Sequence, residues 1–336
     1  MTGFWRGWRS WGLALLAGAA ALAYFLGNTP SSARVETRFL MDTLVTLTVW
    51  GAQDDEARRA VSAAFEALEA VDREMAGVPG TPLWDLNQAG HGVLSPRMAD
   101  VLTASIRWAR RTGGTFDPTV APLLDLWDIP AGPHSPPSAD AVASALVRVG
   151  WQRVSWDAAG RRVELGGTSL DFGGIAKGYA LDRAAEALRG AGVRDFIVDA
   201  GGDLFVSGAK GKDRWRVGVQ HPRDHDRLLR VVTPQEGAFV TSGDYERFFE
   251  WEGRRFHHIL DPRSGYPASG CRSVTVWAPT ALDADALATA LFVLGPELGL
   301  ALLKDVPQAE ALFVDSEGRV VETDGFSRVA PEAAGR

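Results

Sequence analysis

The segment from residue 168 to residue 208 constrains the fold of this chain more than any other. Its pattern predicts a short strand that ends at Leu170, a glycine turn, and then a helix that starts near Ile175. Apolar residues recur along one side of this helix, which ends at the glycines of residues 190–192. A second strand over residues 196–198 leads into another glycine turn, Gly201-Gly202.

Two interpretations of this segment stay open from the residues alone. Glycine has no Cβ, so a ligand can approach the backbone closely at a strand-to-helix turn. The free N–H groups of a helix start favour an anion such as a phosphate. In an ordinary β–α–β unit, however, the same glycines only make turns. The dinucleotide pattern G-x-G-x-x-G does not occur here, so the glycines by themselves favour the ordinary unit.

Composition narrows the class of protein. The chain has 336 residues, 46% hydrophobic and 23% charged, which is a globular balance with room for one or two domains. The net charge is −7 and the arginines are scattered, so we expect no nucleic-acid partner. A single cysteine, Cys271, excludes an internal disulfide, a cysteine-rich metal site and a CxxC redox motif. We expect this cysteine to be an inert structural residue.

The N-terminus has the layout of an export signal. Arg6 and Arg9 precede an apolar run over residues 11–26, and a candidate cleavage region follows at residues 30–33. The run is shorter than the about 20 residues that a membrane span needs. We therefore expect residues 1–33 to be a signal peptide or membrane anchor. The mature protein is then exported to the periplasmic side of the inner membrane, anchored or soluble after cleavage.

Beyond the N-terminus, the pattern predicts a mixed α+β fold around one continuous core, in which strands come in runs and helices are inserted between them. Strands are expected over residues 34–40, 43–50, 151–156, 162–165, 215–220, 228–232, 238–241, 248–250, 255–258, 273–277, 311–314 and 320–322. Helices are expected over residues 54–75, 95–111, 120–127, 138–147, 283–294 and 297–304, and a loop over residues 77–92. We expect two lobes with a cleft between them.

Asp285 and Thr289 form a candidate cation site. On a helix these residues are one turn apart and share a face. A carboxylate and a hydroxyl are oxygen ligands of the kind that Mg²⁺ prefers. The alternative is capping of the helix N-terminus by Asp283 or Asp285, with Thr289 simply packed, and the spacing alone favours this structural explanation.

The segment His257-His258 is a candidate for proton transfer. In a strand, adjacent side chains point to opposite faces, so one histidine can be buried and the other can face a site. A histidine near neutral pH can accept a proton from an attacking hydroxyl. A purely structural histidine is the alternative. The turn at residues 241–245 can likewise be a pocket edge or a simple turn.

Taken in order, the motifs of this chain closely resemble the ApbE-type FAD:protein FMN transferase family. The resemblance covers residues 34–325 and rests on Met41-Asp42-Thr43, GGTFDPTV (113–120), LDFGGIAKGYALD (170–182), DAGGDLFVSG (199–208), TSGDYERFF (241–249), HHILDPRSGYP (257–267) and DADALATA (283–290). It implies a two-lobed, T-fold-like transferase domain over residues 34–328 with a central FAD cleft.

The resemblance also implies site residues. The positions that match the FAD site are Met41, Thr115, Phe116, Asp117, Asp171, Lys177 and Ile259. The positions that match the metal site are Gly174, through its main-chain carbonyl, and Asp285, Ala288 and Thr289. Two of these positions differ from relatives. Lys177 stands where an acidic residue is frequent, and Ala288 stands where relatives have Ser or Asp, so that water or the Ala288 carbonyl would replace one metal contact.

The activity that the resemblance implies is Mg²⁺-dependent transfer of FMN from FAD to a Ser or Thr hydroxyl of a partner protein, with release of AMP. We expect His258 to take the hydroxyl proton. Two alternatives use the same residues: an FAD pyrophosphatase that gives FMN and AMP, and a non-catalytic exported FAD-binding protein. The expected acceptors are membrane redox subunits, such as those of Na⁺-pumping quinone reductase or related electron-transfer complexes.

Overall fold

A large antiparallel sheet organises the molecule. The computed structural model describes residues 33–129, 135–224 and 226–333. Within these residues the main sheet has eight strands in the order β1-β2-β6-β7-β10-β13-β14-β15, and all neighbours are antiparallel. The strands are β1 (Ala33–Leu40), β2 (Thr43–Trp50), β6 (Asp195–Ala200), β7 (Asp203–Ser207), β10 (Gly237–Gly243), β13 (Cys271–Ala278), β14 (Glu310–Asp315) and β15 (Val320–Glu322).

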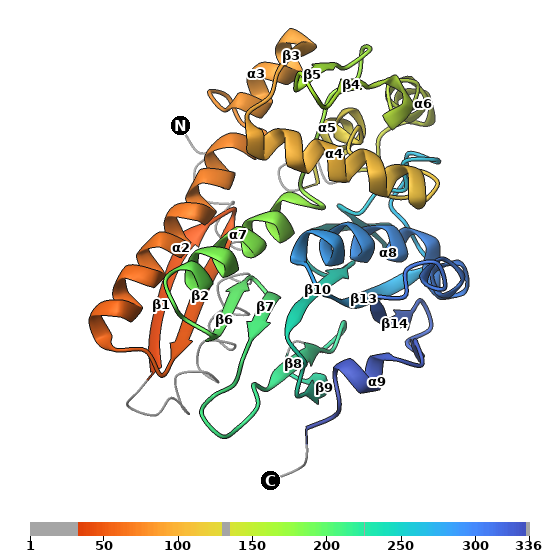
Figure 1. Cartoon of the computed structure of the whole chain (residues 1–336). Helices are drawn as coiled ribbons and strands as arrows, with labels where there is room; N and C mark the ends of the chain where they lie inside the picture. Colours follow the sequence, from red (N-terminus) through yellow and green to blue (C-terminus); the bar gives the residue numbers. More distant parts are fainter. Residues whose placement is uncertain (1–32, 130–134, 225, 334–336) are drawn as a thin grey trace, which may run out of the picture.

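Three long helices cover one face of this sheet (Figure 1). They are α2 (Asp54–Met75), α7 (Ala176–Gly190) and α8 (Ala281–Leu303). The largest cluster of buried apolar side chains lies between them and the strands. A smaller cluster on the other face contains Trp215, Phe239 and Phe326 and is covered by β8 (Val217–Gln220), β9 (Leu228–Val232) and α9 (Phe326–Val329). The predicted mixed α+β fold is confirmed.

A second layer of elements lies at one end of the main sheet and its three helices (Figure 1). It contains α3 (Pro82–Ala89), α4 (Pro96–Arg111), α5 (Ala121–Trp127) and α6 (Ala139–Leu146), a single 3₁₀ turn (Trp151–Arg153), the small sheet β3 (His91–Val93), β5 (Arg162–Glu164), β4 (Ser155–Asp157), and the hairpin β11 (Phe248–Trp251) and β12 (Arg254–His257). The hairpin packs on α5 and α6, because Phe249 and Phe256 share a buried cluster with Trp127.

Helices α7 and α8 contact each other closely at their N-terminal ends. The carboxylate of Asp182 accepts hydrogen bonds from the N–H groups of Ala281 (2.7 Å) and Leu282 (3.0 Å), two of the donors that a helix start leaves without a helical partner. A Cβ atom on Gly178 would overlap the carbonyl oxygen of Ala281. Glycine at position 178 therefore permits the contact, and Asp182 fixes it.

Three expectations about the elements are wrong. No strand ends at Leu170, because its backbone N–H and C=O both bond to the side chain of Asn87 (2.8 Å each) instead of to a neighbouring strand. The segment at residues 168–208 is consequently not a β–α–β unit, and β6 and β7 form an antiparallel hairpin. The expected loop at residues 77–92 contains α3 and part of β3, and the expected strand at residues 151–156 begins as the 3₁₀ turn Trp151–Arg153 before β4. The two helices expected at residues 283–294 and 297–304 are confirmed, because the backbone of α8 is non-helical at Gly295 (φ 75°), which separates two helical segments.

Helix α8 is long and apolar enough to cross a membrane, and in this respect it stands alone among the described residues. Its role here is different: it lies against β10 and β13 in the core, with most of its first half buried. The predicted signal or anchor covers residues 1–33, of which all but Ala33, the first residue of β1, lie outside the described part of the chain, and it stays a prediction.

Candidate functional site

Two tight turns meet at one end of the main sheet. The β1–β2 turn is Met41-Asp42, and both residues have positive φ (51° and 58°), which is the left-handed region that favours glycine. The β6–β7 turn is Gly201-Gly202. The N–H of Gly201 donates to the carbonyl of Leu44 (3.1 Å), and a Cβ on Gly201 would overlap the Thr43 hydroxyl. The predicted FAD contact Met41 thus lies at the sheet end where β7 begins.

A lysine and two buried aspartates lie where α7, α8 and β7 meet. Lys177 Nζ is 2.5 Å from Asp203 Oδ2, and the other oxygen of Asp203 accepts the N–H of Thr241 (3.0 Å). Asp285 Oδ2 accepts the N–H of Gly178 (2.9 Å). Burial, followed by the negative charge of Asp203, raises the pKa of Asp285 above its ordinary value. The sequence had left open a phosphate at the start of α7. One of the N–H groups there, that of Gly178, is already bonded to the Asp285 carboxylate.

The predicted metal residues lie next to one another. The Thr289 hydroxyl faces the backbone of Gly174: a Cβ built there would be 3.0 Å from Thr289 Oγ1 and 3.4 Å from Phe116 Cε2. No hydrogen bond from this hydroxyl is found within the described part of the chain. Asp285 lies one turn before Thr289 on the same helix. The side chain of Ala288 is a fully buried methyl group and supplies no oxygen.

These residues fit a hard cation that has few protein ligands. No group of three or more His, Cys, Asp or Glu side chains that could hold a metal exists among the described residues. One oxygen of the Asp285 carboxylate accepts no N–H, the Thr289 hydroxyl has no hydrogen-bond partner there, and the Gly174 backbone lies beside that hydroxyl. Mg²⁺ is typically held by one or two protein groups together with phosphates and water. The donor set therefore suits Mg²⁺ and does not suit a transition metal that needs several nitrogen or sulfur ligands.

The predicted FAD residues before α7 form a connected unit. The N–H of Asp171 donates to the carbonyl of Pro118 (2.8 Å), so the turn at residues 115–118 is joined to the α7 approach. Asp171 Oδ1 accepts the N–H of Gly173 (2.8 Å). The Thr115 hydroxyl donates to the carbonyl of Thr112 (3.1 Å). Through Phe116, this turn also packs on Gly174.

Asp117 is held by its own neighbours. Its buried carboxylate accepts hydrogen bonds from the N–H and hydroxyl of Thr119 (2.9 and 2.6 Å) and from the N–H of Trp151 (3.0 Å). Burial raises its pKa, and these hydrogen bonds partly offset that shift. The Asp117 side chain shapes the turn, so a contact with FAD would have to come from the turn's backbone.

The two histidines have different surroundings. His257 is buried: its Nε2 lies 2.7 Å from the carbonyl of Ala268, and its Nδ1 accepts the N–H of Ile259 (3.3 Å). His258 is half-buried, with Nδ1 3.3 Å from the carbonyl of Arg247. Burial first, and then the charge of Arg247, lower the pKa of His258 to about 3. His258 is therefore neutral at pH 7 and, in the flavin-free protein, a weak base, whereas both ring nitrogens of His257 are bonded to the backbone.

Two important residues were not assigned a role from the sequence. Asp203 holds Lys177, and Asp182 positions α8 against α7. Asp182 lies in the motif at residues 170–182, and Asp203 lies in the motif at residues 199–208. The available signal was the presence of a carboxylate in an otherwise apolar pattern, since every residue of β7 is buried and Asp182 lies four residues after Gly178 on the buried side of α7.

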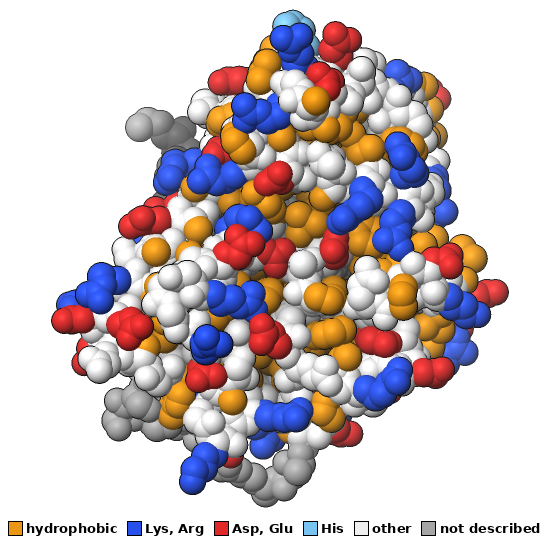
Figure 2. All heavy atoms as spheres, viewed as in Figure 1, with side chains coloured by type: hydrophobic (Ala, Val, Ile, Leu, Met, Phe, Trp, Pro, Cys, Tyr) orange, Lys and Arg blue, Asp and Glu red, His pale blue; other side chains and the backbone are white. Residues whose placement is uncertain are grey.

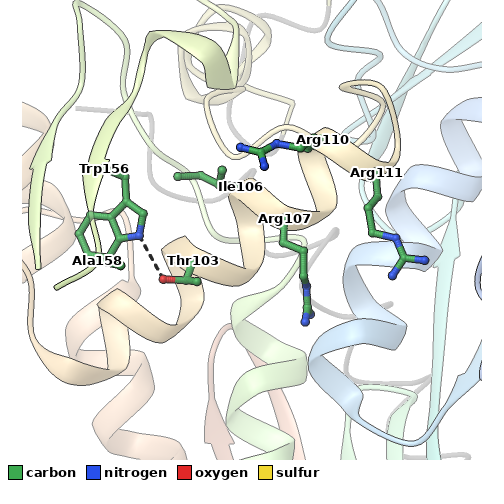
Figure 3. Close-up of a pocket in the computed structure, with 7 residues that line it drawn as sticks. All are labelled: Thr103, Ile106, Arg107, Arg110, Arg111, Trp156 and Ala158. Atoms are coloured by element: carbon green, nitrogen blue, oxygen red, sulfur yellow. Dashed lines mark hydrogen bonds between the residues drawn. The ribbon is translucent and has the colours of Figure 1, made fainter.

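A surface groove of about 310 Å³ lies elsewhere, between α4 and the small sheet (Figure 3). The Trp156 side chain is turned toward α4 and its Nε1 donates to the Thr103 hydroxyl (3.1 Å). The groove is lined by Thr103, Ile106, Arg107, Arg110, Arg111, Trp156 and Ala158, none of which is a predicted site residue. On the face shown in Figure 2, side chains of both charges are interspersed.

Comparisons with known proteins agree with the predicted family. The model of the ApbE family matches residues 41–313 of this chain. The FAD:protein FMN transferase of Treponema pallidum is 37% identical over 259 residues, which cover 71% of this chain and 72% of that protein. An FAD:protein FMN transferase of Klebsiella pneumoniae is 34% identical over 235 residues, 67% of each protein.

Solved structures show the same fold. The crystal structure of the ApbE protein from Thermotoga maritima matches with a TM-score of 0.82 at 33% identity, over 88% of this chain and 99% of that one. The apo form of the flavinyl transferase ApbE of Pseudomonas stutzeri matches with a TM-score of 0.77 at 30% identity, over 90% of this chain and 98% of that one.

Proposed function

This chain belongs to the ApbE family and is a transferase that uses FAD, and from that premise we propose that it attaches FMN to a Ser or Thr hydroxyl of a partner protein in a Mg²⁺-dependent reaction. The observation that carries this proposal is the juxtaposition of Gly174, Asp285 and Thr289 beside the unit formed by Asp171 and the turn at residues 115–118. Oxygen ligands for a divalent cation thus lie next to the predicted FAD positions.

The proposed reaction is a phosphoryl-type transfer. The acceptor oxygen bonds to the FMN-side phosphorus of FAD, the bond from that phosphorus to the bridging oxygen breaks, and AMP leaves with the electron pair. Mg²⁺, when bound, would neutralise charge on the diphosphate and on the departing phosphate. Asp285, Thr289 and the Gly174 carbonyl would hold the cation, and water would stand where Ala288 brings no oxygen.

His258 takes the proton of the acceptor hydroxyl in this proposal. Its imidazole is neutral at pH 7 because burial and the charge of Arg247 lower its pKa. A neutral imidazole has a free lone pair for the proton, and the negative diphosphate would raise its basicity when FAD is bound. His258 precedes Ile259, a predicted FAD-lining residue, and the charge of Lys177 also acts on His258.

The N-terminal sequence supports a proposal for the cellular location and, through the location, for the class of acceptor. Basic residues before an apolar run support export of the chain to the periplasmic side of the inner membrane. We propose that the acceptors are outward-facing domains of membrane redox subunits, such as those of Na⁺-pumping quinone reductase or related electron-transfer complexes. A transferase and its acceptor must share one compartment, and export places them together.

The direct test is an in vitro transfer assay. The protein is mixed with FAD, Mg²⁺ and a purified acceptor domain from the same cell, and after denaturation the acceptor band is examined for flavin fluorescence. We expect fluorescence on that band, and we expect chelator or the double variant D285A/T289A to abolish it. AMP and free FMN without labelled acceptor would instead identify an FAD pyrophosphatase. Bound FAD that stays intact would identify a carrier.

The role of His258 is tested separately. We expect His258→Ala to slow transfer by about 10²–10⁴-fold, the usual contribution of a general base, while FAD still binds. His91→Ala is the matched control, because His91 is exposed on β3 in the second layer. Near-normal transfer by His258→Ala at neutral pH, with FAD bound, would show that another group takes the proton.

A further inference from the structure

Lys177 lies beside two buried aspartates, Asp203 and Asp285. Its ammonium group forms an ion pair with Asp203 (2.5 Å), and the neighbouring residue in α7, Gly178, donates its N–H to Asp285 (2.9 Å). Asp203 and Asp285 are both buried, whereas about one third of the Lys177 side chain is exposed. Lys177 is therefore the partly exposed member of a cluster that contains two buried carboxylates.

The charges of this cluster do not balance by themselves. Asp203 has a direct ion-pair partner, and Asp285 has none within 4.0 Å in the described part of the chain. A buried carboxylate without a nearby positive charge is strongly disfavoured. Lys177 directly precedes Gly178, whose N–H is bonded to Asp285, so the ammonium charge acts on Asp285 as well as on Asp203. Lys177 thus partly satisfies a carboxylate that the proposed cation would otherwise satisfy.

We infer that Lys177, held in place by Asp203, is a built-in counter-charge that weakens divalent-cation binding to the flavin-free enzyme and so makes cation binding depend on FAD. This inference rests on the proposed function, since Asp285 is the cation ligand there. Without FAD, a divalent cation at Asp285 is repelled by the ammonium group. With FAD, the two negative charges of the diphosphate compensate both positive groups, and cation and FAD bind together.

The direction in which loss of Lys177 changes cation affinity distinguishes a counter-charge from a direct contact with FAD. If Lys177 mainly contacts the flavin or its diphosphate, its loss weakens FAD binding and leaves cation binding to the flavin-free protein unchanged. If Lys177 is a counter-charge, its loss strengthens cation binding, because a unit charge inside a site of low effective dielectric changes affinity by about tenfold or more. Asp203 acts in the opposite direction, because its charge offsets that of Lys177.

The experiment measures Mn²⁺ binding to the full chain without FAD, by electron paramagnetic resonance or calorimetry. The expected order of affinity is K177M above wild type, wild type close to K177M/D203N, and D203N weakest. Lys304→Met is the matched control, since Lys304 is exposed at the end of α8 and should leave the affinity unchanged. K177Q serves as the second variant if K177M does not fold.

Thermal unfolding gives an independent readout. In chelator, K177M is expected to unfold at a lower temperature than wild type, and Mn²⁺ is expected to restore more stability to K177M than to wild type, because ligand that binds only the folded state stabilises it. Mn²⁺ binding by K177M that is equal to or weaker than wild type overturns the inference but leaves the transferase proposal intact. Absence of Mn²⁺ binding to every variant, with and without FAD, overturns both the inference and the metal dependence.

Discussion

Gly178 is the single residue on which the contact between α7 and α8 depends most directly. Because a Cβ at this position would overlap the Ala281 carbonyl and approach the Asp285 side chain, we predict that Gly178→Ala destabilises the fold by about 3 kcal/mol or more. Urea unfolding measures this change. Gly190→Ala, in the same helix and with open space around the new methyl, is expected to stabilise by about 0.4–1 kcal/mol. Equal effects of the two variants would show that the helices can separate without cost.

Asp182 gives a prediction about pH. Burial raises its pKa to about 6 despite its two hydrogen bonds to the start of α8. A carboxyl group whose pKa is raised in the folded state contributes stability below its unfolded pKa and loses that contribution as the pH rises through the folded pKa. Wild type should therefore lose about 2 kcal/mol between pH 4.5 and pH 7 from this group, a loss that Asp182→Asn lacks.

The contributions of other buried acids to the pH dependence of stability cancel in this comparison, because wild type and Asp182→Asn both contain those acids. Urea unfolding of wild type and Asp182→Asn at the two pH values gives the difference directly. The stability of the variant relative to wild type is expected to improve as the pH rises. A relative stability that falls with rising pH would mean that the ionised carboxylate is the form that α8 requires.

In the β1–β2 hairpin, the effect of backbone strain on stability can be measured separately from contact with FAD, because two adjacent turn residues are strained and only one is a predicted FAD contact. Met41 and Asp42 both adopt positive φ, which costs of order 1 kcal/mol for a residue other than glycine. We predict that Asp42→Gly stabilises the protein by about 0.5–1 kcal/mol and leaves FAD affinity unchanged, because Asp42 is exposed. Met41→Gly relieves the same strain but removes a predicted FAD contact, so FAD affinity should fall.

Both variants are compared by urea unfolding and by FAD titration. Unchanged FAD affinity in Met41→Gly would remove Met41 from the FAD site. A loss of FAD affinity in Asp42→Gly would show that the turn geometry, and not the methionine side chain, is what the ligand needs.

Elements with strong periodicity were predictable from the sequence. Helix α2 was expected with its observed bounds, because eight buried apolar residues recur along it at helical spacing. The extended approach to α7 was not predictable, because Leu170 is held by the side chain of Asn87, 83 residues earlier, and no local pattern reports such a contact. Helix α3 was missed because only Leu83 and Leu86 are buried in it.

Across the whole molecule, the residues of the candidate site come from segments that only the fold brings together. The family resemblance supplied Gly174, Asp285 and Thr289, and the structure places Gly174 against the Thr289 hydroxyl, with Asp285 one helical turn before Thr289. Spacing along α8 alone had favoured a capping role for Asp285, but Thr280 is the cap and Asp285 points to Gly178. The ion pair between Lys177 and Asp203 could not be predicted, because it depends on how β7 begins beside α7.

We predict that residues 1–32 are a targeting segment that the folded domain does not need for its stability. The main sheet starts at Ala33, and the buried core runs from Val45 to Ala330. A chain that begins at residue 33 should therefore unfold at the same temperature as the full chain and label a purified acceptor at the same rate. In cells, the full chain should fractionate with the inner membrane or periplasm and label an exported acceptor, whereas the shortened chain should remain in the cytoplasm and leave that acceptor unlabelled. Loss of folding on truncation would assign residues 1–32 a structural role, and full labelling by the shortened chain would place the reaction before export.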